Sequence, residues 1–153
     1  MTAKLSATMP RALVLVVEDD QATRALYCEH LDAAGFRTAD AHNGFQALDK
    51  ARQLRPDAIV TDLAVPGMNG FEFCRALQRS IDTRDIPILA VTGHPEYLDD
   101  PDRFRQAGIA RVLVKPCDPD TIARALQELL GARGGSEAGE GGSLAVVRVK
   151  DRE

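Results

Sequence analysis

The sequence predicts an α/β fold in which a doubly wound parallel sheet carries helices on both faces. Short apolar runs alternate with segments of helical composition along the 153 residues of the chain. The runs are rich in β-branched residues and lack polar alternation, which is typical of parallel strands buried on both faces. Parallel neighbours need a crossover connection, and the segments between the runs are long enough to be helices.

Five runs have the length and composition of strands. The first, Leu13 to Val17, is an unbroken apolar run after a short leader. The predicted strands are residues 13–17, 36–41, 58–61, 86–91 and 111–114. A helical segment follows each of them, so we expect five strands and five helices.

Five segments are predicted to be helices, and three of them end at a residue that commonly stops a helix. They are residues 21–34 before Gly35, 47–54 before Pro56, 70–78, 102–107 and a last helix that runs into Gly131. The last helix has the clearest apolar stripe, formed by Ile122, Ala125, Leu126, Leu129 and Leu130. Pro95 and Pro101 bracket an acidic stretch, for which we expect a long loop.

The composition divides the chain into one domain and two flanking segments. Residues 1–10 are predicted to be a flexible leader and residues 11–131 the folded domain. Six of the twelve glycines lie between Gly131 and Ser143, so residues 132–153 are predicted to be a flexible tail. We expect no output domain. The alternative for the tail is that residues 144–149 add a strand to the sheet edge of a partner.

Charge and hydropathy exclude several classes of protein. The formal net charge of −4 lacks the basic excess of a nucleic-acid-binding protein. No apolar run reaches the ~18 residues of a membrane helix, and the N-terminus lacks a secretory signal, so we expect a cytoplasmic protein without membrane insertion. The three widely spaced cysteines, Cys28, Cys74 and Cys117, predict neither a disulfide framework nor a zinc site.

Reactive side chains gather where the predicted strands end. In an open parallel sheet the ligand site lies at the carboxyl ends of the strands. The residues just past or at those ends are Glu18, Asp19, Asp20, Asp62, Thr92 and Lys115. Clustered carboxylates repel one another and imply a cation, and oxygen ligands favour Mg²⁺. With a lysine and a hydroxyl to hold phosphoryl oxygens, Asp62 is left to attack phosphorus.

These residues resemble a known family, the receiver domain of bacterial two-component response regulators. The matching motifs are Val16-Val17-Glu18-Asp19-Asp20, Asp62 to Gly70, Val91-Thr92-Gly93 and Val114-Lys115-Pro116. The resemblance covers roughly residues 13–130. It implies a flavodoxin-like, CheY-like receiver fold with five parallel strands in the order 2-1-3-4-5 and five helices.

The resemblance implies a phosphoacceptor and a Mg²⁺ site. By position, Asp62 is the phosphoacceptor. The metal ligands are Glu18, Asp19, Asp62 and the backbone carbonyl of Ala64. We expect Asp20 to cap the following helix, where an acidic side chain is favourable.

A phosphate-binding and switch set is implied in the same way. Thr92 is the switch hydroxyl and Lys115 the partner of the phosphoryl group. Gly93 has no side chain, which leaves room for that group to approach the backbone. The resemblance also implies a cis peptide bond before Pro116.

The function that follows is a stand-alone response regulator of a phosphorelay. It would accept a phosphoryl group from a sensor histidine kinase or a histidine phosphotransfer protein and signal to a downstream protein through contacts. It is then a switch that catalyses only its own phosphorylation and dephosphorylation. The resemblance implies signalling, and dimerisation where it occurs, through the last two helices and the fifth strand.

One residue departs from the receiver pattern. Receivers usually carry an aromatic residue three positions before the lysine, and here that position is Val112. We therefore expect phosphorylation to change mainly the conformation of the loop from Gly93 to Pro101.

Two other functions remain alternatives. A phosphohydrolase of the haloacid-dehalogenase type also uses an aspartate nucleophile and Mg²⁺, but it needs a second aspartate where this chain has Ala64. A pseudo-receiver would keep the fold as an interaction module without phosphorylation. The complete set of motif residues argues against it, and only Val112 favours it.

Overall fold

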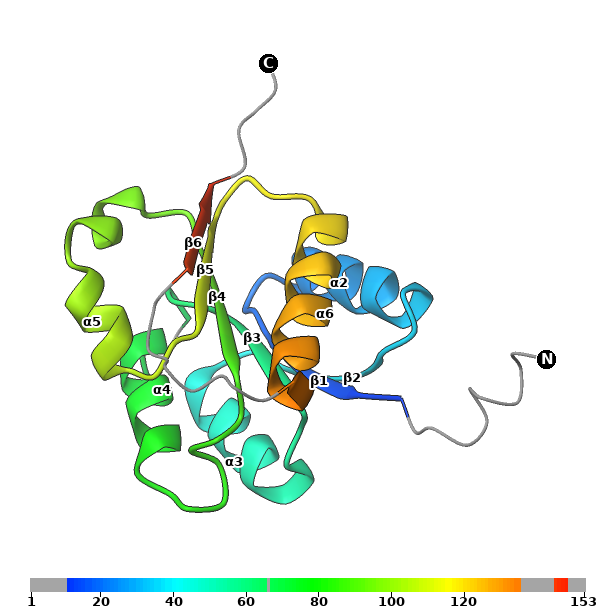
Figure 1. Cartoon of the computed structure of the whole chain (residues 1–153), viewed down its shortest axis with the longest axis horizontal. Helices are drawn as coiled ribbons and strands as arrows, with labels where there is room; N and C mark the ends of the chain where they lie inside the picture. Colours follow the sequence, from blue (N-terminus) through cyan, green and yellow to red (C-terminus); the bar gives the residue numbers. More distant parts are fainter. Residues whose placement is uncertain (1–10, 66, 136–144, 149–153) are drawn as a thin grey trace.

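The architecture is a single parallel sheet between two layers of helices. Figure 1 shows a computed structural model of the chain, described for residues 11–65, 67–135 and 145–148. The strands are β1 (Leu13–Val17), β2 (Arg37–Ala41), β3 (Ala58–Asp62), β4 (Ile88–Thr92), β5 (Arg111–Val114) and β6 (Ala145–Arg148). The helices are α2 (Gln21–Ala33), α3 (Gly44–Leu54), α4 (Gly70–Gln78), α5 (Pro101–Gln106) and α6 (Pro119–Gly135), with a 3₁₀ helix η1 (Pro95–Asp99).

The strand order is β2-β1-β3-β4-β5-β6, and every neighbouring pair is parallel. The first five strands confirm the predicted order 2-1-3-4-5. The chain leaves β1 for one side and returns to the other side at β3, so the direction of winding changes at β1. The carboxyl ends of β1 and β3 therefore lie next to each other at the switch point, where open α/β sheets bind ligands.

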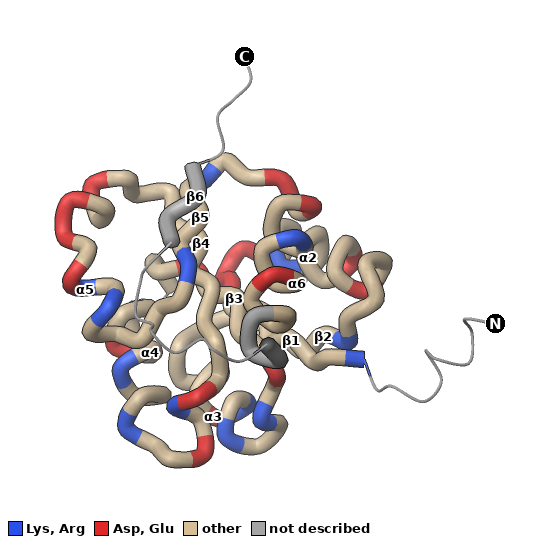
Figure 2. The backbone as a smooth tube through the Cα atoms, viewed as in Figure 1, with Lys and Arg blue, Asp and Glu red and all other residues tan. Residues whose placement is uncertain are grey.

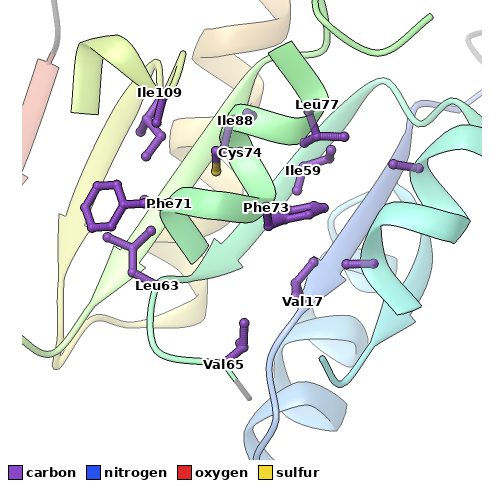
Figure 3. Close-up of a cluster of buried hydrophobic side chains, with 14 of the residues drawn as sticks. Val17, Ile59, Leu63, Val65, Phe71, Phe73, Cys74, Leu77, Ile88 and Ile109 are labelled. Atoms are coloured by element: carbon purple, nitrogen blue, oxygen red, sulfur yellow. The ribbon is translucent and has the colours of Figure 1, made fainter. Parts of the chain in front are cut away.

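The two faces of the sheet bury separate halves of the core. In β1, Leu15 and Val17 pack on the face covered by α3, α4 and α5, while Val14 and Val16 pack on the face covered by α2 and α6. Figure 1 shows these two layers, and Figure 3 shows side chains of the first cluster around Phe73 of α4. Burial on both faces explains why the strand has no polar alternation.

Several boundaries differ from the prediction for local reasons. Helix α3 begins at Gly44, before the predicted position 47, because the side chain of Asn43 accepts a hydrogen bond from the backbone N–H of Gln46 at 2.8 Å and caps it. Strand β4 begins at Ile88 instead of residue 86. Part of the stretch expected as a loop forms η1, which begins with Pro95 in the first turn, where proline fits a helix start.

The last helix extends beyond its predicted end. Helix α6 continues through Gly131 to Gly135. A glycine inside a helix costs only about 1 kcal/mol relative to alanine, so Gly131 alone does not stop it. The following Ala132 and Arg133 are good helix formers.

The prediction of a wholly flexible tail was wrong for residues 145–148. These residues form β6, which pairs in parallel with β5 at the edge of the sheet. The physical reason is an open strand edge next to a segment with two β-branched valines, Val146 and Val147. The leader and the other tail residues after Gly135 lie outside the described residues. In the described ranges no helix is both long and apolar enough to span a membrane.

Candidate functional site

The sheet brings the predicted site residues together at its carboxyl end. Glu18 follows β1, Asp62 is the last residue of β3, Thr92 is the last residue of β4 and Lys115 follows β5. The parallel register aligns Thr92 with Val114, directly before Lys115. The four side chains therefore come from four strands that end at one edge.

A lysine ammonium joins the two buried carboxylates of this site. The Nζ atom of Lys115 lies 2.8 Å from Oδ2 of Asp62 and 3.4 Å from Oε1 of Glu18. Glu18 is 3% exposed and Asp62 is 8% exposed, so both acids are largely removed from water. A buried charge needs a partner of opposite sign, and Lys115 provides one for both acids.

The loop after β3 holds the second oxygen of Asp62. The backbone N–H of Ala64 donates a hydrogen bond to Oδ1 of Asp62 at 2.9 Å. Gly70 closes the loop, because its N–H donates to the carbonyl of Leu63 at 3.0 Å. A Cβ at Gly70 would lie 2.5 Å from Cα of Leu63, so only glycine allows this close approach. Asn69 then caps α4 in a reciprocal capping box with Glu72.

Glu18 is positioned by both its backbone and its side chain. Its N–H donates to the carbonyl of Ala41 at 3.0 Å, and its Oε2 accepts from the N–H of Asp20 at 2.9 Å. The side chain of Asp20 turns to the helix and accepts from the N–H and hydroxyl of Thr23. Asp20 is thus the N-cap of α2, whereas Asp19 is exposed beside Glu18.

Arg24 was missed by the sequence reasoning. Its NH1 donates to the carbonyl of Glu18 at 2.8 Å, and its Nε lies 3.2 Å from Oδ2 of Asp40 at the end of β2. The Arg24 side chain is only 17% exposed. It therefore ties the turn that carries the acidic pair to α2 and β2. The sequence feature that could have identified Arg24 is its position one helical turn after the cap residue Asp20.

Thr92 and Gly93 form the wall of the site next to Lys115. Thr92 is fully buried, and its hydroxyl oxygen accepts a hydrogen bond from the N–H of His94 at 3.0 Å. A Cβ at Gly93 would lie 3.8 Å from Cδ of Lys115, an ordinary contact distance, so Gly93 lies directly beside the Lys115 side chain. The peptide bond between Lys115 and Pro116 is cis.

An open cleft of about 480 Å³ lies beside these residues. It is lined by Thr23, Tyr27, Gly93, Lys115, Pro116 and Cys117. Burial raises the pKa of Tyr27 to about 12 and the pKa of Cys117 to about 11, so both groups are neutral near pH 7. The cleft thus offers the ammonium group of Lys115 as its cationic group.

Burial and charge shift the two principal titrating groups of the site. Burial raises the pKa of Glu18, and the cationic charge of Lys115 partly offsets this effect. Burial alone would lower the pKa of Lys115, but its hydrogen bond and attraction to Asp62, together with the charge of Glu18, raise the pKa above its usual value. Lys115 is therefore cationic at neutral pH.

The fold agrees with the comparisons with known proteins. A family model described as the response regulator receiver domain matches residues 14–127. The chain belongs to this family. As a receiver it is 33% identical over 123 residues to the polar-differentiation response regulator DivK of Brucella anthropi, a match that covers 80% of this chain and 98% of DivK.

Solved receiver structures superpose on the same part of the chain. The chemotaxis response regulator CheY4 of Vibrio cholerae matches with a TM-score of 0.72 and 34% identity over 78% of this chain and 99% of CheY4. The receiver domain of a Pseudomonas aeruginosa sensor histidine kinase, which has a magnesium ion coordinated in its active-site cleft, matches with a TM-score of 0.72 and 29% identity over 80% of this chain and 99% of that domain. The chain is therefore a receiver-type response regulator of two-component signalling. Neither alternative, the phosphohydrolase or the pseudo-receiver, is favoured by these matches.

Proposed function

We propose that this receiver accepts a phosphoryl group on Asp62 from a sensor histidine kinase or a histidine phosphotransfer protein. The observation that carries the proposal is the contact of the Lys115 ammonium with both Asp62 and Glu18 at the switch point of the sheet. Lys115 masks the negative charge of the acceptor and is placed to bind the phosphoryl oxygens once they arrive. Of the two acids, Asp62 lies nearer to the Lys115 ammonium, at 2.8 Å against 3.4 Å for Glu18, and Lys115 lines the open cleft.

The donor set suits a magnesium ion. Among the described residues no three acidic, histidine or cysteine side chains are grouped as a metal cage. Mg²⁺ does not need such a cage, because it keeps several waters and uses one or two carboxylates. We propose Glu18, Asp19, Asp62 and the backbone carbonyl of Ala64 as its protein ligands. The bound ion would supply positive charge to neutralise the oxygens of the transferred group.

The residues of the chain have distinct tasks in the transfer. A carboxylate oxygen of Asp62 forms the new bond to phosphorus while the bond from phosphorus to the donor histidine nitrogen breaks. Lys115 stabilises the charge on the phosphoryl oxygens, and the hydroxyl of Thr92 donates a hydrogen bond to one of them. Gly93 leaves the space into which the group enters. In the hydrolysis of the acyl phosphate, water attacks phosphorus, the bond from phosphorus to the Asp62 oxygen breaks, and inorganic phosphate leaves the free carboxylate.

The proposed role is a switch without another substrate. The receiver would catalyse only its own phosphorylation and dephosphorylation and would pass the signal to a downstream protein through contacts. In the present state the oxygen of Thr92 holds the N–H of His94. When the Thr92 side chain turns its hydroxyl toward a phosphoryl group, its hydrogen bond with the N–H of His94 changes. His94 lies at the start of the loop from Gly93 to Pro101. This loop then transmits the conformational change, because position 112 holds a valine instead of an aromatic residue.

Intact mass spectrometry tests the proposal directly. The natural chain is incubated with Mg²⁺ and acetyl phosphate, and we expect one phosphoryl increment. The increment should be absent in Asp62→Asn and when a chelator removes Mg²⁺. Asp85→Asn is the matched control, because Asp85 is an exposed aspartate before β4. An increment that persists in Asp62→Asn would show that another residue is the acceptor.

A further inference from the structure

The edge strand β6 is an addition to the receiver fold of this chain. The family model ends at residue 127, whereas β6 covers residues 145–148. Figure 1 shows β6 beside β5, on the side away from β4. The register pairs Arg111 with Ala145 and Val114 with Arg148, so β6 spans the whole length of β5. Without it, β5 would be the edge of the sheet.

Without β6, the outer edge of β5 could pair with another strand. A strand at an edge presents a row of unpaired N–H and C=O groups that can pair with another chain. In β5, Val112 and Leu113 are fully buried, so the strand is held firmly in the sheet. A rigid edge loses little conformational freedom when a further strand pairs with it.

The connection to β6 favours pairing within one molecule. Residues 136–144, nine residues in all, join the end of α6 to β6. Because a parallel strand needs a long crossover, α6 together with this connection returns the chain to the start of β5. A short tether provides an effective concentration on the order of millimolar. A strand from another protein must compete with β6, which is present at that effective concentration.

We propose that the outer edge of β5 is an acceptor site for an extended peptide strand, and that the C-terminal segment of this chain fills it in cis. The ligand class is a short parallel strand with a β-branched apolar centre, and the occupant is residues 145–148 with Val146 and Val147 at that centre. Another protein that pairs with β5 must first displace them. The outer edge of β5 lies two strands away from β3, which carries Asp62, and the inference does not depend on phosphorylation.

Hydrogen exchange on the full-length chain tests the assignment. The variant Val146→Pro/Val147→Pro removes two consecutive backbone donors from β6, one of which faces β5 in any register. We expect the β5 amides that point away from β4 to exchange at least tenfold faster in this variant. The amides that point toward β4 should not change. The variant Ala138→Pro/Gly141→Pro is the matched control, with the same number of prolines in the connection.

A synthetic peptide of residues 143–150 supplies the second measurement. We expect it to bind the variant Val146→Pro/Val147→Pro, to restore slow exchange in β5, and to bind the natural chain far more weakly because the site is filled. The same peptide with both prolines should not bind.

Three results would overturn the proposal. Exchange in β5 that is equal in the natural chain and the proline variant would show that β6 does not cover the edge. Equal binding of the peptide to both chains would show that it binds elsewhere. A dimer of the natural chain that the proline variant loses would show that the strand is exchanged between two copies. Phosphorylation of Asp62, measured separately by mass, distinguishes these failures from a failure of the proposed function.

Discussion

The two ends of the sheet carry similar charged side chains in different surroundings. Figure 2 shows the positions of the basic residues in blue and of the acidic residues in red along the backbone. At the carboxyl end the Lys115 ammonium contacts two acids, Glu18 and Asp62, that are 3% and 8% exposed. At the amino end Arg55 pairs with Asp82 at 3.4 Å, but their side chains are 62% and 53% exposed. Water and salt screen the second pair, so its contribution to stability is small.

Burial of the charged side chains, more than the presence of an ion pair, distinguishes the candidate site from the amino end of the sheet. Burial of two carboxylates at the carboxyl end lowers the stability of the fold, so stability alone does not explain their position. The two buried acids, Glu18 and Asp62, contact a lysine that lines an open cleft. Buried charged groups beside a cleft are typical of a site that binds a charged ligand. A cleft of about 460 Å³ lies at the amino end as well and Arg55 lines it, but the charges of Arg55 and Asp82 stay in contact with water. Substitutions at the two ends should therefore differ strongly in effect.

The largest effect is expected for Lys115→Ala. This variant leaves Glu18 and Asp62 close together without their shared cation and removes the group proposed to bind the phosphoryl oxygens. We expect the initial rate of phosphorylation by acetyl phosphate to fall by about 100-fold or more, as for loss of one transition-state donor. The rate is measured by intact mass at fixed Mg²⁺. A circular dichroism spectrum like that of the natural chain is the control for folding, and a rate within threefold of the natural chain would contradict the role of Lys115.

An intermediate effect is expected for Arg24→Lys. Lysine cannot bond the Glu18 carbonyl and Asp40 at the same time with the geometry of the guanidinium group. We expect the dissociation constant for Mg²⁺, measured by calorimetry, to rise about tenfold, as is typical when a supporting partner of a ligand is removed.

Arg111→Lys is the matched control for Arg24→Lys. Arg111 is also 17% exposed and pairs with an acid, Glu128 of α6, away from the candidate site. We expect Mg²⁺ binding to be unchanged in this variant. Equal weakening in both variants would mean that Arg24 acts only through general stability.

The smallest effect is expected for Asp82→Asn at the amino end. The variant breaks the exposed pair with Arg55, and exposed pairs contribute about 0.2–1 kcal/mol at most. We expect the free energy of unfolding in urea to change by less than about 0.5 kcal/mol and the phosphorylation rate to stay the same. A loss of several kcal/mol would remove the contrast between the two ends of the sheet.

Much of the fold followed from local patterns in the sequence. The unbroken apolar run at residues 13–17 predicts a strand buried on both faces, and both faces of β1 are buried in the structure. Two of the shifted boundaries have an identified cause, the cap at Asn43 and the tolerated glycine at Gly131. These depend on which side chain reaches which backbone group, and composition alone does not specify that.

Local patterns in the sequence predict the class of the protein, because alternating strands and helices force a parallel sheet and place Asp62 and Lys115 at its carboxyl end. Which charges meet there depends on the three-dimensional packing. The contacts of Lys115 with Glu18 and Asp62 join residues 97 and 53 positions apart. The same holds for the ion pair of Arg24 with Asp40 and for the pairing of β6 with β5. Such contacts depend on the packing of several elements at once, and no local periodicity encodes them.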